Sequence, residues 1–322
     1  MILTVTLNPL LERRLVFHSV ELGKNNKCID EKYAAGGKGI NVSRQLNYLG
    51  IQNSALTFLG GNNGKILRSI LTEEKINFSI QSTKSETRIA DVIIENDTKR
   101  ITTFFGINSK ISKEEAGEFK NKLERMIQNC SIVVFSGSSP CDETNSIFPF
   151  GIELANKYDK ISILDTYGKH LNDCLNVSPT VVHNNISEVE ESLSIKLHND
   201  EEKINYLKNL YAKGIKLSFL TDGANYFFAS KFDFIYKISF PSVEPVDSTG
   251  SGDAFTAGIA YGLENSQVFD DFVKIATALG IANATKLETC NVAKHEYEKY
   301  LSDIIVEPVG KKMKIIDDTP NY

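Results

Sequence analysis

The residues best suited to chemistry lie in the last third of the chain. Residues 247–253 read DSTGSGD and run directly into AFTAGIAYGL, a stretch of small residues that predicts a helix. Glycines at a helix start let a ligand approach the backbone closely, and the free N–H groups and helix dipole there favour an anion such as phosphate. Asp253 in the same turn repels phosphate, which indicates a general base that takes a proton from an attacking hydroxyl. An ordinary glycine turn, in which Asp253 merely complements the helix dipole, is the alternative that this segment alone leaves open.

A second glycine-rich segment, residues 35–41 with the sequence AGGKGIN, precedes a predicted helix over Val42–Leu49. Lys38 can act as a point charge for phosphate, and Asn41 can hydrogen-bond a hydroxyl. The alternative is a flexible turn with a solvated lysine. Neither segment has the spacing of a P-loop or of the dinucleotide fingerprint. Two anion-binding helix starts in one chain favour a phosphotransfer site for two substrates.

Three further patterns have both a functional and a structural interpretation. Asn185 and Glu188 lie on one helix face and could hold Mg²⁺ through its waters, but the same spacing is that of a capping box. Arg88, on a predicted strand, clamps a phosphate if it faces inward and is otherwise a solvated residue. Residues 60–65, GGNNGK, approach the P-loop pattern but predict a turn before a helix.

Short apolar runs alternate with longer amphipathic stretches along most of the chain. This alternation predicts a doubly wound α/β structure with a mainly parallel sheet covered on both faces. Ser112 and Glu115 form a capping-box pattern at the start of a helix predicted to reach Met126. The predicted buried strands are Ile2–Leu7, Ser54–Leu59, Ser131–Phe135, Ile161–Leu164, Pro179–Val182 and Leu217–Leu220.

Two regions alternate at period two without intervening helices. Leu15–Val20 with Lys27–Tyr33, and Thr87–Glu95 with Lys99–Phe105, predict antiparallel pairs in a small sheet outside the main fold. Such a sheet beside an α/β pocket could serve as a lid. The sequence alone leaves two alternatives equally open: an addition to the fold without a role at the site, or a contact between subunits of an oligomer. The polar segment from Gly310 predicts a terminal strand and a frayed end.

Composition narrows the class of protein. The 322 residues carry 36 Lys+Arg and 41 Asp+Glu, for a net charge of −5, which gives no whole-protein reason to bind nucleic acid or an anionic membrane. The sequence offers no apolar run long enough to span a membrane, no signal-peptide pattern at its start, and five cysteines without a CxxC pair. We therefore expect a cytoplasmic, reduced protein without zinc.

Taken together and in order, these segments resemble a known family. The opening TLNP, then GGKGINVSRQLNYLG, then DSTGSGDAFTAGIAYGL are similar to the signatures of ribokinase-like PfkB carbohydrate kinases, within them the branch of 1-phosphofructokinase and tagatose-6-phosphate kinase. The resemblance runs from residue 1 to about residue 300 and includes residues 86–88 (ETR), residues 136–140 (SGSSP) and Asn185-x-x-Glu188. It implies a three-layer α/β/α core with a small β-sheet lid. It also implies ATP-dependent phosphorylation of a ketohexose phosphate, of the fructose 1-phosphate or tagatose 6-phosphate type, to the bisphosphate, with Mg²⁺ as cofactor.

The resemblance also assigns roles to residues that match the family's motifs. Asp253 resembles the catalytic base, beside an anion hole. The implied site comprises Thr249, Gly250, Ser251 and Gly252 for the anion hole; Glu12, Gly37, Lys38, Asn41, Arg88 and Ser138 for the sugar phosphate; Asn185, Asp222, Gly223, Ala276 and Asn283 for the nucleotide; and Asn185 and Glu188 for Mg²⁺ through water.

Four positions depart from the family pattern. Glu12 replaces an aspartate, His183 a lysine, Leu220 a glycine and Ala90 an asparagine. The first three motivate an alternative: a catalytically weak or inactive sugar-phosphate or nucleotide-binding protein with the kinase fold. The retained Asp253 favours the kinase.

The two anion-binding segments lie near opposite ends of the chain yet should meet at one site. We therefore expect one ribokinase-like domain over residues 1–322, with a discontinuous lid at approximately residues 12–34 and 86–106. A homodimer through the lid is suggested by analogy alone.

Overall fold

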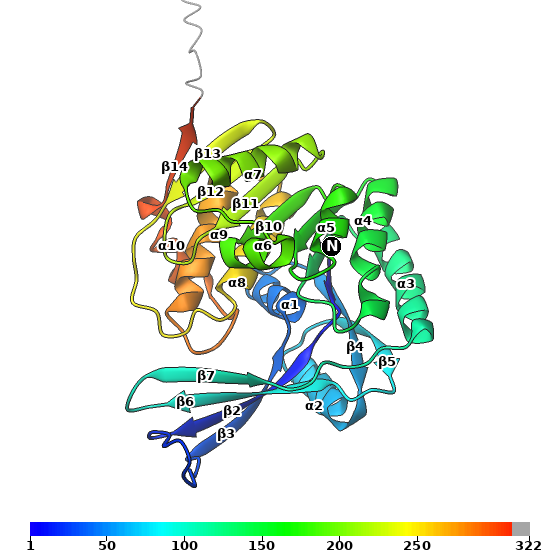
Figure 1. The fold of residues 1–322 in the computed structure, drawn as a ribbon, viewed down its shortest axis with the longest axis vertical. Helices are drawn as coiled ribbons and strands as arrows, with labels where there is room; N and C mark the ends of the chain where they lie inside the picture. The colour runs from blue at the N-terminus through cyan, green and yellow to red at the C-terminus, as the bar shows by residue number, and fades with distance from the viewer. Residues whose placement is uncertain (311–322) are drawn as a thin grey trace, which may run out of the picture.

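A ten-stranded sheet forms the centre of the molecule in a computed structural model that describes residues 1–310 (Figure 1). Its order is β14-β13-β12-β11-β10-β9-β8-β1-β4-β5, parallel from β5 to β11 and antiparallel beyond. The strands are β1 (Ile2–Thr6), β4 (Asn53–Gly60), β5 (Phe78–Thr83), β8 (Ile132–Ser136), β9 (Ile161–Asp165), β10 (Val181–Asn185), β11 (Leu217–Thr221), β12 (Phe227–Lys231), β13 (Phe234–Ser239) and β14 (Ile305–Val309).

All six predicted strands belong to this sheet. β1, β4 and β8 are buried along their whole length, as expected for strands covered on both faces. Sequence reasoning missed β5 and the antiparallel edge β12–β14, because edge strands such as β14 are partly exposed and have mixed sequences. The strand predicted from Gly310 onward falls outside the described residues.

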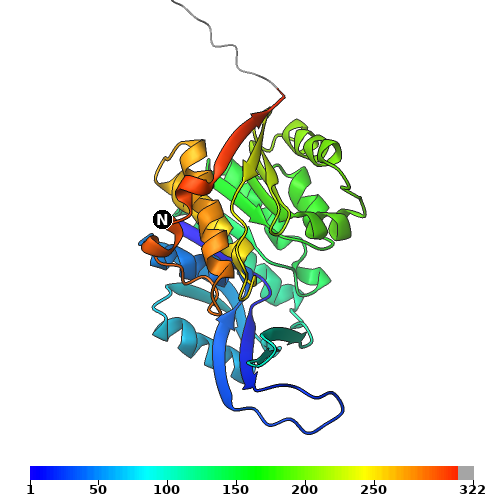
Figure 2. The same ribbon diagram turned by 90° about the vertical axis from the view of Figure 1, so that its left-hand side faces the viewer.

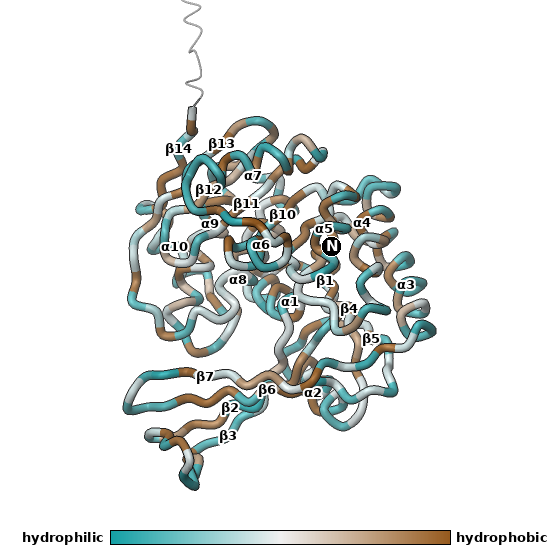
Figure 3. The backbone as a smooth tube through the Cα atoms, in the orientation of Figure 1, coloured by the Kyte–Doolittle hydropathy of each residue, from teal (hydrophilic) through white to brown (hydrophobic). Residues whose placement is uncertain are grey.

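Helices cover both faces of the sheet and create the three-layer α/β/α fold that the sequence predicts. Alternate residues of β8 show the division: Ile132 and Val134 pack with α1, α8 and α9, whereas Val133 and Phe135 pack with α3 and α4. Figure 3 shows hydrophobic residues along the strands and hydrophilic residues on the outer turns. The helices are α1 (Lys38–Tyr48), α2 (Gly61–Glu73), α3 (Lys113–Gln128), α4 (Ile147–Lys157), α5 (Leu171–Asn176), α6 (Ile186–Leu193), α7 (Asp200–Ala212), α8 (Ser251–Glu264), α9 (Phe269–Ala284) and α10 (Lys294–Glu298), with 3₁₀ turns at Asp142–Thr144 and Leu301–Asp303.

At the helix starts, one local prediction is confirmed and another is corrected. Ser112 and Glu115 form the predicted capping box of α3, with the Glu115 N–H donating to Ser112 Oγ at 3.2 Å. The turn predicted over residues 60–65 is instead the first part of α2: β4 ends at Gly60, the helix begins at Gly61, and the N–H of Asn63 donates to Glu86. None of the helices within residues 1–310 combines the length and apolarity that crossing a membrane requires.

A separate four-stranded sheet projects from the body and has the order β3-β2-β6-β7 (Figures 1 and 2). Both predicted antiparallel pairs, β2 with β3 and β6 with β7, are confirmed. The parallel pairing of β2 with β6 was not predicted. It arises because β2 follows β1 and β6 follows β5, so both strands leave the same edge of a parallel sheet in one direction. The bounds are β2 (Leu10–Phe17), β3 (Asp30–Gly36), β6 (Arg88–Glu95) and β7 (Arg100–Phe105).

Candidate active site

The two glycine-rich segments meet where α1 and α8 begin. Asn41, in the first turn of α1, donates from Nδ2 to Oδ2 of Asp253 at 2.8 Å. Asp253 is the third residue of α8, and only 4% of it is exposed. Gly250 precedes the helix with a φ of 78°, a left-handed conformation that favours glycine, and a Cβ there would collide with Thr289.

The turn into α8 offers free amides to an anion. The N–H of Thr249 donates to Asp247 Oδ1 at 2.9 Å, and that of Ser251 donates to the Ser248 carbonyl at 3.1 Å. Within residues 1–310, the N–H groups of Gly250, Gly252 and Asp253 have no acceptor. The backbone donors in the predicted anion hole are therefore those of Gly250 and Gly252, joined by that of Asp253, and the amides of Thr249 and Ser251 shape the turn.

Asp253 has the electrostatics of a base that works near neutral pH. Burial raises the pKa of its carboxyl to about 7, the attraction of Lys38 opposes this rise, and the repulsion of Asp165 adds to it. Its Oδ1 has no hydrogen-bond donor among the described residues. That oxygen is the one available to accept a proton from a bound hydroxyl.

Lys38 lies between two carboxylates. Its Nζ is 3.0 Å from Oδ1 of Asp165 and 2.8 Å from Oε1 of Glu188. Burial lowers the pKa of Lys38, but the attraction of both carboxylates outweighs burial and holds that pKa well above its usual value. Lys38 is thus a fixed cation at the cavity, more restrained than the solvated or freely reaching lysine that the sequence suggests.

Asp165, which the sequence reasoning missed, is the fully buried centre of this network. It follows the predicted strand Ile161–Leu164 directly, and the carboxyl end of a parallel strand is where functional residues gather. Ser136 Oγ donates to its Oδ2 at 2.9 Å, and His183 Nδ1 lies 3.5 Å from its Oδ1. Burial raises the pKa of Asp165, but Lys38 and His183 more than compensate and keep that pKa well below its ordinary value.

The capping interpretation of Asn185 and Glu188 is confirmed. Asn185 Oδ1 accepts the N–H of Glu188 at 2.8 Å, and Glu188 Oε2 accepts the N–H of Asn185 at 3.3 Å. Both residues also border the main cavity. The described residues contain no cluster of three or more His, Cys, Asp or Glu side chains that could hold a metal ion.

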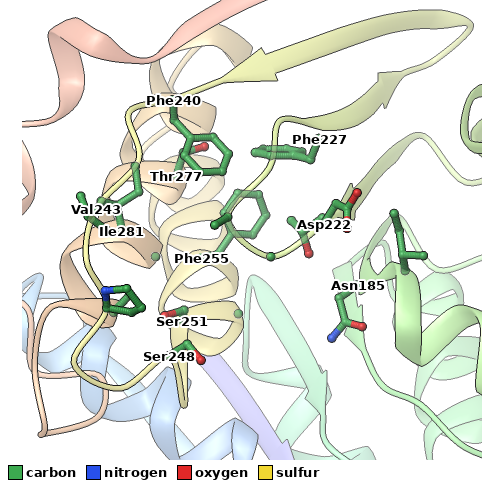
Figure 4. Close-up of a pocket in the computed structure, with 18 of the residues that line it drawn as sticks. Asn185, Asp222, Phe227, Phe240, Val243, Ser248, Ser251, Phe255, Thr277 and Ile281 are labelled. Atoms are coloured by element: carbon green, nitrogen blue, oxygen red, sulfur yellow. The ribbon is translucent and has the colours of Figure 1, made fainter. Parts of the chain in front are cut away.

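A cavity of about 610 Å³ opens between α6, α8, α9 and the segment 240–245. Figure 4 shows Asn185, Ser248 and Ser251 at its polar end and aromatic rings at its other end. This volume suits a nucleotide-sized ligand. The apolar end is formed by Phe227, Phe240, Val243, Phe255, Thr277 and Ile281.

The predicted nucleotide-binding residues divide into two groups. Asn185, Asp222 and Gly223 border the cavity, whereas Ala276 and Asn283 lie behind its wall. Ala276 is fully buried against Gly258, where the close contact of α8 with α9 leaves no room for a side chain. Asn283 instead holds the anion-binding turn, because its Nδ2 donates to the Thr249 carbonyl at 2.9 Å. The sequence did not predict the apolar end of the cavity, because its aromatic residues have the pattern of ordinary core residues.

Arg88 and Ser138 belong to a polar cluster at the base of the small sheet. Arg88 donates to Asn108 Oδ1 and to the Asn8 carbonyl, both at 3.1 Å, and Asn8 Nδ2 donates to Ser138 Oγ at 3.1 Å. Arg88 Nε and Asn8 Oδ1 are buried without partners, and no described carboxylate pairs with Arg88. A buried donor and acceptor left open together point to a bound ligand.

Glu12 forms an ion pair with Arg14, which lies two residues further along β2 on the same face of the small sheet. Arg14 donates to Glu12 Oε2 from Nε at 3.0 Å and from Nη2 at 2.8 Å, and its Nη1 donates to the Leu287 carbonyl at 2.9 Å. Gly36 lies against the other oxygen, since a Cβ there would be 2.7 Å from Glu12 Oε1. Glu12 is thereby fixed beside the glycine loop, close to the implied position of the acceptor. Gly37 has a φ of 123° in the same loop.

The other departures from the family pattern are structural substitutions. The His183 ring packs at a tilt against Phe255 with ring centroids 4.8 Å apart, and its Nδ1 lies 3.1 Å from Thr256 Oγ1. Leu220 is buried in β11, before the turn that contains Asp222. Ala90 is buried in β6 opposite Phe105. None of the three removes Asp253 or the free amides from the site.

Fold and site together define a small-molecule kinase: an α/β/α sheet, an anion-binding turn that carries a buried carboxylate, and a cavity beside them. The family model described as "pfkB family carbohydrate kinase" matches residues 11–296, and the chain belongs to this family. It is 32% identical over 314 residues to a 1-phosphofructokinase of Borreliella burgdorferi, covering 96% of this chain and 99% of the relative. It is 30% identical over 309 residues to a tagatose-6-phosphate kinase of Staphylococcus epidermidis, covering 95% and 99%. In fold it is similar to phosphofructokinase-2 from Escherichia coli, with a TM-score of 0.87, 21% identity and coverage of 94% and 98%.

Proposed function

We propose that this chain transfers the γ-phosphoryl group of ATP to a hydroxyl of a ketohexose phosphate, of the fructose 1-phosphate or tagatose 6-phosphate type. The observation that carries the proposal is the pairing of Asn41 with a buried Asp253 beside the free amides of the α8 turn. The names of the two curated relatives support the acceptor class.

In the proposed reaction the acceptor oxygen attacks the γ-phosphorus in line, and the bond from that phosphorus to the β,γ-bridging oxygen of ATP breaks. Asp253 Oδ1 receives the hydroxyl proton, and ADP leaves with the bridging oxygen. The amides of Gly250, Gly252 and Asp253 stabilise the charge on the transferring group. Closure of the small sheet over the acceptor would exclude water and limit ATP hydrolysis.

The cavity residues fit Mg²⁺ held through water. Asn185 and Glu188 border the polar end, and Glu188 Oε1 already pairs with Lys38, so this pair would hold the ion indirectly. Mg²⁺ supplies charge neutralisation on the phosphates when it is bound. A non-catalytic binder has no use for an open, buried carboxylate with a pKa near neutrality, so the kinase is favoured.

The end of β7 presents Phe104 and Phe105, and the segment after it presents Ile107; these residues are 60%, 66% and 90% exposed. Exposed apolar residues of this kind suit an interface between protomers. The homodimer through the lid, the single-domain division and the cytoplasmic location stay predictions.

The first prediction concerns pH. Because burial raises the pKa of Asp253 to about 7, kcat/KM for the acceptor should fall as pH falls through about 7. A pH–rate profile at saturating ATP measures this acidic limb. A limb near about 4, the value of an ordinary aspartate, would contradict the assignment.

The second prediction concerns the charge on the acceptor. Arg88→Met should raise KM for a ketohexose phosphate by about 10²-fold, because a half-buried guanidinium whose Nε has no partner suits an anion, and should leave KM for ATP nearly unchanged. Steady-state kinetics with both substrates varied give the two constants. Arg100→Met is the matched control, since Arg100 pairs with Glu95 at the far end of the same sheet. Equal activity of the wild type on free sugar would refute the phosphate clamp.

A further inference from the structure

Arg44 is a buried arginine next to the reacting groups, with every nitrogen engaged. Its Nη1 donates to Asn41 Oδ1 at 2.8 Å, its Nη2 to the Ala35 carbonyl at 2.6 Å, and its Nε to Glu74 Oε2 at 2.8 Å. Only 9% of Arg44 is exposed. The guanidinium is therefore anchored from α2 and β3 and presents one fixed N–H to Asn41.

The two hydrogen bonds that link Arg44, Asn41 and Asp253 can run in one direction only. A guanidinium only donates, so the side of the Asn41 amide that faces Arg44 must be its oxygen. The NH₂ group then faces Asp253 Oδ2, at 2.8 Å. A flipped amide would place NH₂ against a cation and its oxygen against a carboxylate, which is unfavourable at both ends.

We propose that Arg44 is a positioning residue for proton transfer: it fixes the Asn41 amide so that a donor, and not an acceptor, faces Asp253. The proposal deepens the proposed function and rests on Asp253 as the general base. With Oδ2 engaged by Asn41, Oδ1 is left to accept the hydroxyl proton, so Arg44 selects which carboxylate oxygen reacts. Among the described residues, Asn41 is the only one that is hydrogen-bonded to both Arg44 and Asp253.

The orientation of Asn41 has a measurable consequence. Donation from Asn41 lowers the pKa of Asp253, against burial, which raises it. Loss of Arg44 frees the amide to turn, and the pKa of Asp253 should then rise further. The other charged or titratable groups around Asp253 are Lys38 on α1, Asp165 on β9, His183 on β10, Glu188 on α6 and Cys290 after α9, and none of them is substituted in the variants below.

The experiment is a carbon-13 NMR titration of the side-chain carboxyls in the free, full-length protein, with Asp253→Asn to identify the resonance. Arg44→Met should move the Asp253 midpoint upward by about half a pH unit or more, and should lower kcat by about tenfold. Arg100→Met, which removes an equal charge far from Asp253, should leave the midpoint unchanged.

A double-mutant cycle separates positioning from a direct charge effect. In an Asn41→Ala background, Arg44→Met should add no shift, because the amide through which Arg44 acts is gone. An unchanged midpoint in Arg44→Met, or an equal shift in both backgrounds, overturns the proposal. If Arg44→Met does not fold, Arg44→Lys keeps a cation beside Glu74 and should give a smaller shift that also vanishes in the Asn41→Ala background.

The titration needs no substrate, so its result is independent of turnover. If the wild type turns over substrate but Arg44→Met leaves the titration midpoint of Asp253 unchanged, this inference is refuted and the proposed function is not. A midpoint that responds through Asn41 in a wild type without turnover would support the positioning and refute the proposed function.

Discussion

Replacing Asp253 with asparagine should lower turnover by at least about 10²-fold, because the variant keeps the shape of the site and loses the proton acceptor. Binding of ATP and of the acceptor should change little, since neither depends on proton transfer. Single-turnover kinetics with saturating substrates measure the chemical step directly. A decrease smaller than about 10²-fold would show that Asp253 is not the base.

Asp271→Asn is the matched control for this variant. Asp271 is the third residue of α9, as Asp253 is of α8, but it is exposed and faces no cavity. If Asp253 only complemented a helix dipole, the two substitutions would have similar effects, each on the order of 1 kcal/mol in stability or less. The proposed role predicts a loss of turnover for Asp253→Asn alone.

The pH dependence of stability distinguishes a loss of turnover in this variant from a loss of fold. The folded-state pKa of Asp253 is raised, so the folded protein binds this proton more tightly than the unfolded chain and becomes less stable as pH rises from about 4 through about 7. Asparagine removes that penalty. The free energy of unfolding of Asp253→Asn should exceed that of the wild type at pH 8 and match it near pH 4, as urea denaturation can measure.

Lys38→Met should have the second large effect. It leaves Asp165 and Glu188 without the cation that lies 3.0 and 2.8 Å from them, and breaking a buried ion pair in this way costs about 3–5 kcal/mol in stability. Turnover should fall as well, because loss of Lys38 raises the pKa of Asp253 and removes positive charge from the cavity. Chemical denaturation at pH 7 and the acidic limb of the pH–rate profile measure the two effects.

Lys286→Met offers a control of similar exposure outside the cavity. Its Nζ pairs with Glu296 at 2.9 Å, and its side chain is 22% exposed, against 24% for Lys38. This control should move neither the acidic limb nor KM for ATP. Lys38→Arg should restore most of the stability. A Lys38→Met protein as stable as the wild type would contradict the ion-pair network.

The parts of the fold that follow from local patterns could be predicted from the sequence. The six apolar strands are buried on both faces and have a pattern that needs no knowledge of their neighbours. The capping box of α3 depends only on Ser112 and Glu115. The antiparallel strands β12 to β14 could not be predicted so well, because their pairing depends on which strands the fold brings beside them.

The site divides in the same way. The glycine turns and Asp253 have distinctive local sequences, and their meeting through Asn41 agrees with the expected single site. The network around Lys38 could not be predicted, because Asp165 reaches it from a distant strand. Arg44 could not be predicted for a related reason. In the sequence it is an ordinary residue of a predicted helix, and only the folded structure shows that its hydrogen bonds to Glu74 and Ala35 orient it toward Asn41.

The proposed activity of this chain is ATP-dependent phosphorylation of a ketohexose phosphate. Its most direct test is ADP formation by the purified full-length protein with Mg²⁺-ATP and a panel of fructose 1-phosphate, tagatose 6-phosphate, fructose 6-phosphate and free ribose. We expect turnover with at least one ketohexose phosphate, a bisphosphate product, and little or no activity on ribose. Tight binding of ATP and sugar phosphate without ADP formation would contradict the claim and identify a non-catalytic binder.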